Sequence, residues 1–413
     1  MVDSGTVGET LRRLRIASGH SLSAFAEIIR YDKGYLSKIE TGQRRPSLAV
    51  LQRADAALKT GGTLVAHIGH PGRAARRLPK QRPPADVAAP TSTGRAGLPE
   101  LVDRLAARGT ARRGGSIEVA PDRASHGRLA ATAQTLSQDL RALCQQVNAT
   151  TCAGLVEPWA LTLAASVAGC PDETCELLEP AFAYADLAGW MAQESSSEAV
   201  DDWIKLSAVL AGCLGSADAV AHTWIRQAET ALYRCDAAQV LSDADSARAA
   251  AGPGAGVLVS RITAQGAACA GDHDAYAVAI DQMRATTDRP VVIGRFQLGS
   301  TSITDLLGAT IGWCEVDLHR PDQAIQFLEK TVATLAPASV RMRGLFAARL
   351  STAYARIGER RQAVEVGRQA VAHAQRTGSG TTRVQLRAVS HELRRWRRDS
   401  LVQQFLAETA ALT

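Results

Sequence analysis

The stretch SLSAFAEIIRYDKGYLSKIETGQRRP, from Ser21 to Pro46, decides the fold of the first part of this chain. Its apolar residues recur at i, i+3, i+4 and i+7, the pattern of a short helix with one buried face; they are Leu22, Phe25, Ala26 and Ile29. Ser21 stands just before this helix and can cap it by accepting a backbone N–H. The stretch therefore predicts a short, serine-capped helix that packs on one side.

A second helix is predicted after a tight break, with Asp32 as its cap, Leu36 and Ile39 facing inward, and Gly42 ending it. The side chains left outside are mainly basic or hydroxylated. Two short helices of this kind, joined by a tight turn, fit the major groove of B-DNA. The candidate DNA-binding residues are Ser21, Ser23, Lys33, Gly34, Tyr35, Ser37, Lys38, Gln43, Arg44 and Arg45.

Residues 8–60 resemble the XRE-type helix-turn-helix of the phage-repressor family. The matching segments are Leu11–Arg15 in the first helix, Tyr35–Glu40 in the recognition helix, Arg45–Ser47 after it, and Leu51–Leu58 in the closing helix. The resemblance implies a five-helix-type bundle. Within it, Glu40 is expected to contact the first helix rather than DNA, whereas Tyr35 either touches DNA or packs locally. The alternative interpretation is a small helical bundle with a solvated basic face.

The charges and the composition divide the chain into three predicted parts: a DNA-binding domain over 1–66, a basic Pro/Gly-rich linker over 67–122, and a helical repeat domain over 123–413. Residues 1–128 carry 22 Lys+Arg and 11 Asp+Glu, whereas the rest carries 25 and 30. Positive charge at the first end strengthens DNA binding through counterion release. The linker's arginines either add phosphate contacts or belong to a solvated tether, and one helix is predicted at Leu98–Ala107.

In the third part, 123–413, the sequence predicts Ala- and Leu-rich helices that are separated by Gly, Pro or Asp. The predicted fold class is therefore all-α. Leu350, Tyr354, Gly358, Ala363 and Ala370 fall at offsets that resemble a tetratricopeptide repeat. This resemblance is good over 308–376 and only suggestive over 129–307. It implies an α-solenoid of stacked helix pairs with a concave groove.

No catalytic constellation can be recognised, and we expect a non-enzyme without cofactor or metal. The eight cysteines include no CxxC pair, and the nearby pair Cys170 and Cys175 has no matching histidines, so buried thiols in a reducing cytosol are the simplest interpretation. The carboxylates at 201–202 and 243–245 are expected on helix surfaces. Neither a membrane span nor a secretory signal is predicted.

These observations predict a cytoplasmic, sequence-specific transcription regulator, most simply a repressor that binds an inverted repeat as a homodimer. The architecture is similar to that of XRE-plus-tetratricopeptide regulators, including the peptide-sensing quorum regulators of the RRNPP family. That similarity implies a peptide or small-molecule effector in the repeat groove, for which the candidate residues are Trp224, Arg226, Arg295 and Arg341. The alternative is an interaction protein whose repeats bind a protein partner, with DNA binding secondary.

Overall fold

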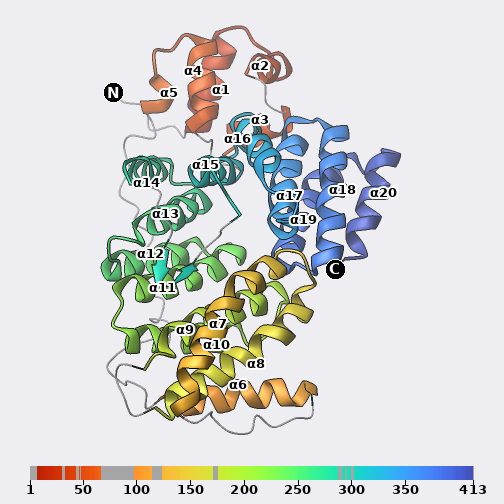
Figure 1. Cartoon of the computed structure of the whole chain (residues 1–413). Helices are drawn as coiled ribbons and strands as arrows, with labels where there is room; N and C mark the ends of the chain where they lie inside the picture. The colour runs from red at the N-terminus through yellow and green to blue at the C-terminus, as the bar shows by residue number, and fades with distance from the viewer. Residues whose placement is uncertain are drawn as a thin grey trace. The chain divides into compact units, whose positions relative to one another are not determined.

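The computed structural model is almost entirely helical, as the sequence predicts, and the chain divides into two compact units, Met1–Val87 and Ala88–Thr413. The structure describes residues 7–29, 33–42, 46, 48–66, 97–113, 123–170, 175–286, 291–293, 295–298 and 302–412. Figure 1 draws the helices of both units, coloured by residue number from the N-terminus to the C-terminus.

The first unit is a small bundle built around one apolar core. Its described helices are α1 (Val7–Ala17), α2 (Leu22–Ile28), α3 (Lys33–Glu40), α4 (Leu48–Leu58) and α5 (Thr63–Ala66). The side chains that fill the core come from all five helices or their ends: Leu11, Phe25, Ala26, Ile29, Leu36, Ile39, Leu51, Ala54 and Leu64. The predicted inward faces of the two helices around the turn are therefore confirmed, with Leu22 half-buried at the edge.

Local signals fix the ends of the two helices. The Ser21 hydroxyl accepts a hydrogen bond from the Ala24 N–H at 3.1 Å, which confirms the predicted N-cap of α2. Gly42 has φ +72°, the left-handed conformation that ends a helix at low cost in glycine. Asp32, the predicted cap of α3, lies outside the described residues.

The second unit is a stack of helices in which chain neighbours pack together (Figure 1). Its helices are α6 (Leu98–Arg113), α7 (Arg123–Cys144), α8 (Ala149–Ala168), α9 (Leu178–Glu194), α10 (Val200–Leu214), α11 (Ala217–Tyr233), α12 (Ala237–Ala250), α13 (Gly256–Ala270), α14 (His273–Ala285), α15 (Leu306–Asp317), α16 (Pro321–Thr334), α17 (Val340–Ile357), α18 (Arg360–Thr377), α19 (Gly380–Leu393) and α20 (Ser400–Ala410). A short 3-10 helix, Arg394–Trp396, precedes α20.

Two elements of this unit differ from the sequence expectations. The helix predicted within the linker is present as α6, but it is longer, and its Leu98, Val102 and Leu105 belong to the core of the second unit, where α6 packs on α8 and α10. The predicted linker, 67–122, is therefore not a continuous tether. A two-stranded antiparallel hairpin, β1 (Val291–Ile293) with β2 (Phe296–Leu298), is also present; Val291 pairs with Leu298.

A buried ion pair joins a late helix of the stack, α17, to an early one, α9. The Arg341 guanidinium on α17 donates to the carbonyls of Cys144 and Val147 at 2.9 Å each and lies 3.2 Å from Glu194 Oε2 on α9. Glu194 also accepts from the Ser379 and Thr381 hydroxyls at 2.5 and 2.8 Å. We call these residues the closure cluster, because they join α17 and α19 to α9 across more than 140 positions of the chain.

Two carboxylates that were expected on helix surfaces are buried. Asp202 and Asp243 are buried, not on helix surfaces, although their neighbours Asp201 and Asp245 are exposed. Asp202 faces Arg104 and Arg108 of α6 at 3.6 and 3.2 Å. By length and composition, α8 resembles a membrane span. Half of its apolar stretch is buried, however, and α8 packs against α6, α7 and α9, as a core helix does.

Candidate nucleic-acid interface and central cavity

The candidate DNA-reading helix, α3, is held by close packing against α1. A Cβ added to Gly8 of α1 would stand 2.0 Å from the carbonyl oxygen of Ile39, so only glycine permits this approach. Leu36 and Ile39 are fully buried on the inner side of α3. The backbone and one face of α3 are therefore fixed by the bundle, which leaves the opposite face for contacts outside it.

A buried salt bridge locks the end of α3 to α1. Arg15 Nε and Nη2 donate to the two carboxylate oxygens of Glu40 at 2.7 Å each, and Arg15 Nη1 donates to the His20 carbonyl at 2.8 Å. The side chains of Arg15 and Glu40 are only 9% and 5% exposed. The Glu40 carboxylate, hydrogen-bonded to the guanidinium, raises the pKa of Arg15. The expected contact between Glu40 and the first helix is confirmed. Both carboxylate oxygens of Glu40 are bound to Arg15, so Glu40 stabilises the bundle.

The predicted DNA-binding residues that the structure describes fully lie at or near the surface. Ser21, Ser23 and Lys33 are exposed, and Ser37 is half-buried. Ser21 is also occupied as the cap of α2, so only part of its hydrogen-bonding capacity is available to a phosphate. Gly34, Tyr35 and Lys38 lie in α3, but their side chains are not described; Gln43, Arg44 and Arg45 lie outside the described residues.

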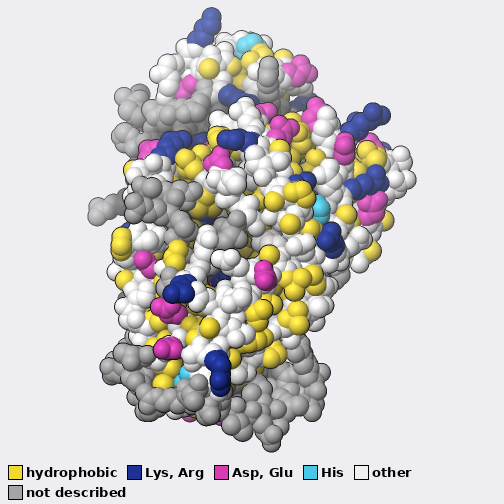
Figure 2. All heavy atoms as spheres, in the orientation of Figure 1, with side chains coloured by type: hydrophobic (Ala, Val, Ile, Leu, Met, Phe, Trp, Pro, Cys, Tyr) yellow, Lys and Arg dark blue, Asp and Glu magenta, His cyan; other side chains and the backbone are white. Residues whose placement is uncertain are grey.

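The surface of the second unit does not concentrate positive charge on the face that Figure 2 shows. Lys and Arg side chains of the helical stack are interspersed there with Asp, Glu and apolar groups. Many of its arginines are paired with carboxylates, as in Arg356–Glu392 and Arg368–Glu408, both at 2.9 Å. This mixed surface agrees with the net negative balance of residues 129–413.

The second unit also contains a cavity of about 350 Å³, which lies between helices from both ends of the stack. Its walls include the aromatic side chains of Trp190, Tyr233, Trp313 and Phe346, and Thr381 of the closure cluster reaches it. The β1–β2 hairpin contributes Gln297. Because α9, α11, α13, α15 and α17 all supply lining residues, the cavity depends on the closure of the stack.

Charged side chains on the cavity wall form a connected network. Asp186 Oδ2 accepts from Arg141 at 3.0 Å, and its Oδ1 lies 3.0 Å from His222 Nε2 and 3.5 Å from Arg226 Nε. Burial by itself would raise the pKa of Asp186, but His222, Arg141 and Arg226 together lower it. Asp186 is therefore an ionised anchor for three cationic or ionisable partners.

A second carboxylate completes this network. Glu229 is paired with Arg226 and with Arg261, whose Nη2 donates to Oε1 at 2.5 Å. Burial opposes ionisation of Glu229, but the two guanidinium groups lower its pKa overall. Since Glu194 is balanced by Arg341, the remaining wall carries three guanidinium groups and two carboxylates, beside the imidazole of His222.

Four buried polar atoms of cavity-lining residues have no hydrogen-bond partner within the described part of the chain. They are Gln145 Oε1, Gln193 Nε2, His222 Nδ1 and Trp313 Nε1. Unpaired buried polar groups cost free energy and are rare in native proteins. Their residues line the cavity, but the four atoms themselves have almost no accessible surface and lie behind its wall.

The predicted ligand-binding residues are distributed differently from expectation. Of the four, only Arg226 lines the cavity; Trp224 is half-buried against the core, and Arg295 is exposed in the hairpin. Arg341 is 1% exposed and belongs to the closure cluster. Its role is therefore to stabilise the fold, and the prediction that it binds a ligand is wrong. Arg141, Arg261 and His222 also line the cavity, but no motif or spacing in the sequence connects them.

The cysteine interpretation also needs correction. The structure places His126 beside Cys170 and Cys175, which are 6% and 7% exposed, so the histidine thought to be missing is present. It stands 44 positions before Cys170, too far for a spacing motif to reveal. Cys235, in contrast, is an exposed thiol.

Comparison with known proteins assigns one part of the chain. Residues 6–68 match the family model described as a helix-turn-helix domain. The comparison with curated proteins finds no match. The first unit therefore contains an N-terminal helix-turn-helix domain, which indicates a DNA-binding regulator.

Proposed function

We propose that this chain is a cytoplasmic, non-enzymatic transcription regulator, most simply a repressor, that binds an inverted repeat as a homodimer. The observation that carries the proposal is the match of residues 6–68 to a helix-turn-helix domain, together with a rigidly held α3 whose neighbourhood exposes Ser23 and Lys33. Dimeric proteins of this class place two recognition helices in successive major grooves about 34 Å apart.

The proposed division of labour within the motif separates base contacts from phosphate contacts. Ser37 and Lys38 are assigned to base edges, and Arg44 and Arg45 to phosphates. Base contacts carry sequence discrimination, whereas phosphate contacts position the protein and make binding depend on salt.

Fluorescence anisotropy on a selected operator and on random DNA tests this division. Lys38→Ala is expected to lose roughly 1–3 kcal/mol on the operator and little on random DNA. Arg44→Ala should weaken both similarly and reduce the salt slope by about one unit. Lys59→Asn is the matched control, because Lys59 is exposed at the end of α4 with φ +54°, a conformation that asparagine tolerates.

Equal losses on operator and random DNA for both variants would refute the assignment. Weak binding to all DNA, together with a stoichiometric protein partner, would favour the interaction-protein alternative.

We further propose that the central cavity of the second unit binds the effector that modulates DNA binding. Three features support this: a volume of about 350 Å³, aromatic walls, and charged wall residues among which guanidinium groups outnumber carboxylates. Small-molecule sites typically have about 300–1,000 Å³ and a few convergent polar groups. The excess positive charge favours a carboxylate, either of a small molecule or at the end of a short peptide.

Thermal shift measurements on the full chain test the cavity. The probes are a panel of aromatic and aliphatic carboxylic acids, each compared with its uncharged amide. At least one acid should raise Tm while its amide does not, and Arg261→Gln should abolish the difference; Arg284→Gln, at an exposed arginine of α14, is the control. Equal effects of acids and amides, or no effect of either, would contradict an anion-binding cavity.

A further inference from the structure

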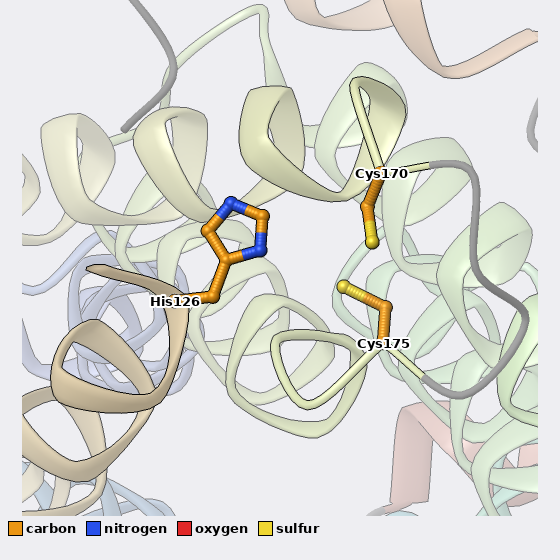
Figure 3. Close-up of side chains that lie close together, drawn as sticks. All are labelled: His126, Cys170 and Cys175. Carbon is orange, nitrogen blue, oxygen red and sulfur yellow. The ribbon is translucent and has the colours of Figure 1, made fainter. Parts of the chain in front are cut away.

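Three side chains that coordinate soft or borderline metals gather at one edge of the second unit. His126 lies in the first turn of α7, Cys170 follows the end of α8, and Cys175 precedes α9. Their ligand atoms (an imidazole nitrogen and two Sγ atoms) all lie within 4.8 Å of one another. Figure 3 shows the two sulfur atoms pointing toward each other and the histidine ring facing them.

The spacing is close to that of a zinc site. With Zn–S bonds of about 2.3 Å and tetrahedral angles, two thiolates on one Zn²⁺ lie about 3.8 Å apart. The three atoms here are within 4.8 Å, so small side-chain rotations suffice to bring them onto one ion. The approach requires no rearrangement of α7, α8 or α9.

The chemistry of the donor set narrows the choice of metal. Two thiolates and an imidazole match zinc, whose protein sites commonly combine sulfur and nitrogen ligands, and not magnesium or calcium, which prefer oxygen. Two thiolates also neutralise a divalent charge. Among the residues that the structure describes, no carboxylate joins the three ligand atoms: Glu176, which follows Cys175, places its Oε2 3.3 Å from the position of a Cβ added to Gly127 and lies outside the group.

We propose that His126, Cys170 and Cys175 bind Zn²⁺, with the fourth tetrahedral position taken by water. The ion ties the first turn of α7 to both ends of the α8–α9 connection, groups that are 44 and 49 positions apart in the chain. Bound zinc therefore holds the start of α7 against α8 and α9, two helices on which α7 packs. Zinc binding is independent of the DNA-binding and effector proposals.

The test uses the full chain, purified under reducing conditions without added metal. Elemental analysis is expected to find one zinc per chain, and metal-depleted protein should bind Co²⁺ with the absorption band of thiolate-to-cobalt charge transfer. Cys170→Ser, Cys175→Ser and His126→Ala should each weaken Zn²⁺ binding by more than about 100-fold, since changes outside the ligand set already cost 10–100-fold. Cys235→Ser is the control, because it removes an exposed thiol elsewhere.

Folding is monitored separately through Tm. Chelation should lower Tm in the wild type and in Cys235→Ser, but should have little effect in His126→Ala, because ligand binding stabilises the folded state only where the ligand binds. The proposal is overturned if the reduced chain binds neither Zn²⁺ nor Co²⁺ through thiolate, if Cys170→Ser binds zinc as tightly as wild type, or if mass spectrometry shows a Cys170–Cys175 disulfide that persists under reducing conditions.

Discussion

Replacing Arg15 by methionine is expected to loosen the helix-turn-helix bundle, because it leaves the Glu40 carboxylate buried without its guanidinium. Arg15 makes two 2.7 Å hydrogen bonds to Glu40 and one of 2.8 Å to the His20 carbonyl. Removing one partner of a buried ion pair typically costs about 3–5 kcal/mol. The bundle is small, so water close to the Arg15–Glu40 pair weakens their interaction. We therefore expect the substitution to lower the free energy of unfolding of the bundle by about 2–3 kcal/mol.

The choice of assay follows from where the tryptophans lie. All six, from Trp159 to Trp396, are in the second unit, so intrinsic fluorescence reports little on the bundle. Hydrogen-exchange mass spectrometry on the full chain resolves peptides from α1 and α3, with α17 as an internal reference. A loss of 2–3 kcal/mol corresponds to exchange that is about 30- to 150-fold faster in α1 and α3.

Two further variants make this prediction decisive. Arg15→Met combined with Glu40→Leu should recover to within about 1 kcal/mol of wild type, because an apolar pair can replace a buried ion pair. Arg12→Met, at an exposed position of the same helix, should change little. Unchanged exchange in Arg15→Met, or a double variant less stable than the single one, would refute the role assigned to this pair.

Three other predictions concern buried groups. Gly8→Ala should destabilise the bundle and abolish DNA binding at 37 °C, because its Cβ would stand 2.0 Å from the Ile39 carbonyl oxygen; hydrogen exchange of α1 checks it. Glu194→Gln should lower the free energy of unfolding of the second unit by about 3–5 kcal/mol, measured by tryptophan fluorescence in urea, since it leaves the Arg341 guanidinium without its carboxylate. Burial raises the pKa of Asp243 from 3.8 to about 6, so its stabilising contribution is present below pH 4 and is lost as pH rises to about 6. Asp243→Asn should therefore stabilise the chain by about 1–2 kcal/mol at pH 7.5 and have no effect at pH 4; equal effects at both pH values would contradict this assignment.

The parts of the fold that the sequence predicts are those set by local signals. The Ser21 cap, the inward faces at Phe25 and Leu36, and the helix-ending Gly42 follow from spacing over a few residues. The contact of Glu40 with the first helix came from resemblance to a known motif, not from the residues alone. These local and motif-based signals were sufficient for the DNA-binding unit.

The parts that could not be predicted depend on contacts between distant helices. The sequence predicts Arg341 as a ligand-binding residue because it is an arginine in the expected repeat groove, but its partner Glu194 lies 147 positions away. For the same reason the sequence does not show that His126 lies beside Cys170, or that residues from α7, α19 and the five helices named above line one cavity. Periodicity identifies each helix and its inward side, but the curvature of the stack decides which inward residues meet.

The most direct test of the central claim, that α3 reads DNA in a symmetric dimer, is a DNase footprint on the region upstream of the chain's own gene at physiological salt. Protection of an inverted repeat, with half-sites about 10–10.5 base pairs apart or a multiple of it and lost in Lys38→Ala, is the predicted result. No protected inverted repeat, or the same protection in Lys38→Ala, would contradict the claim.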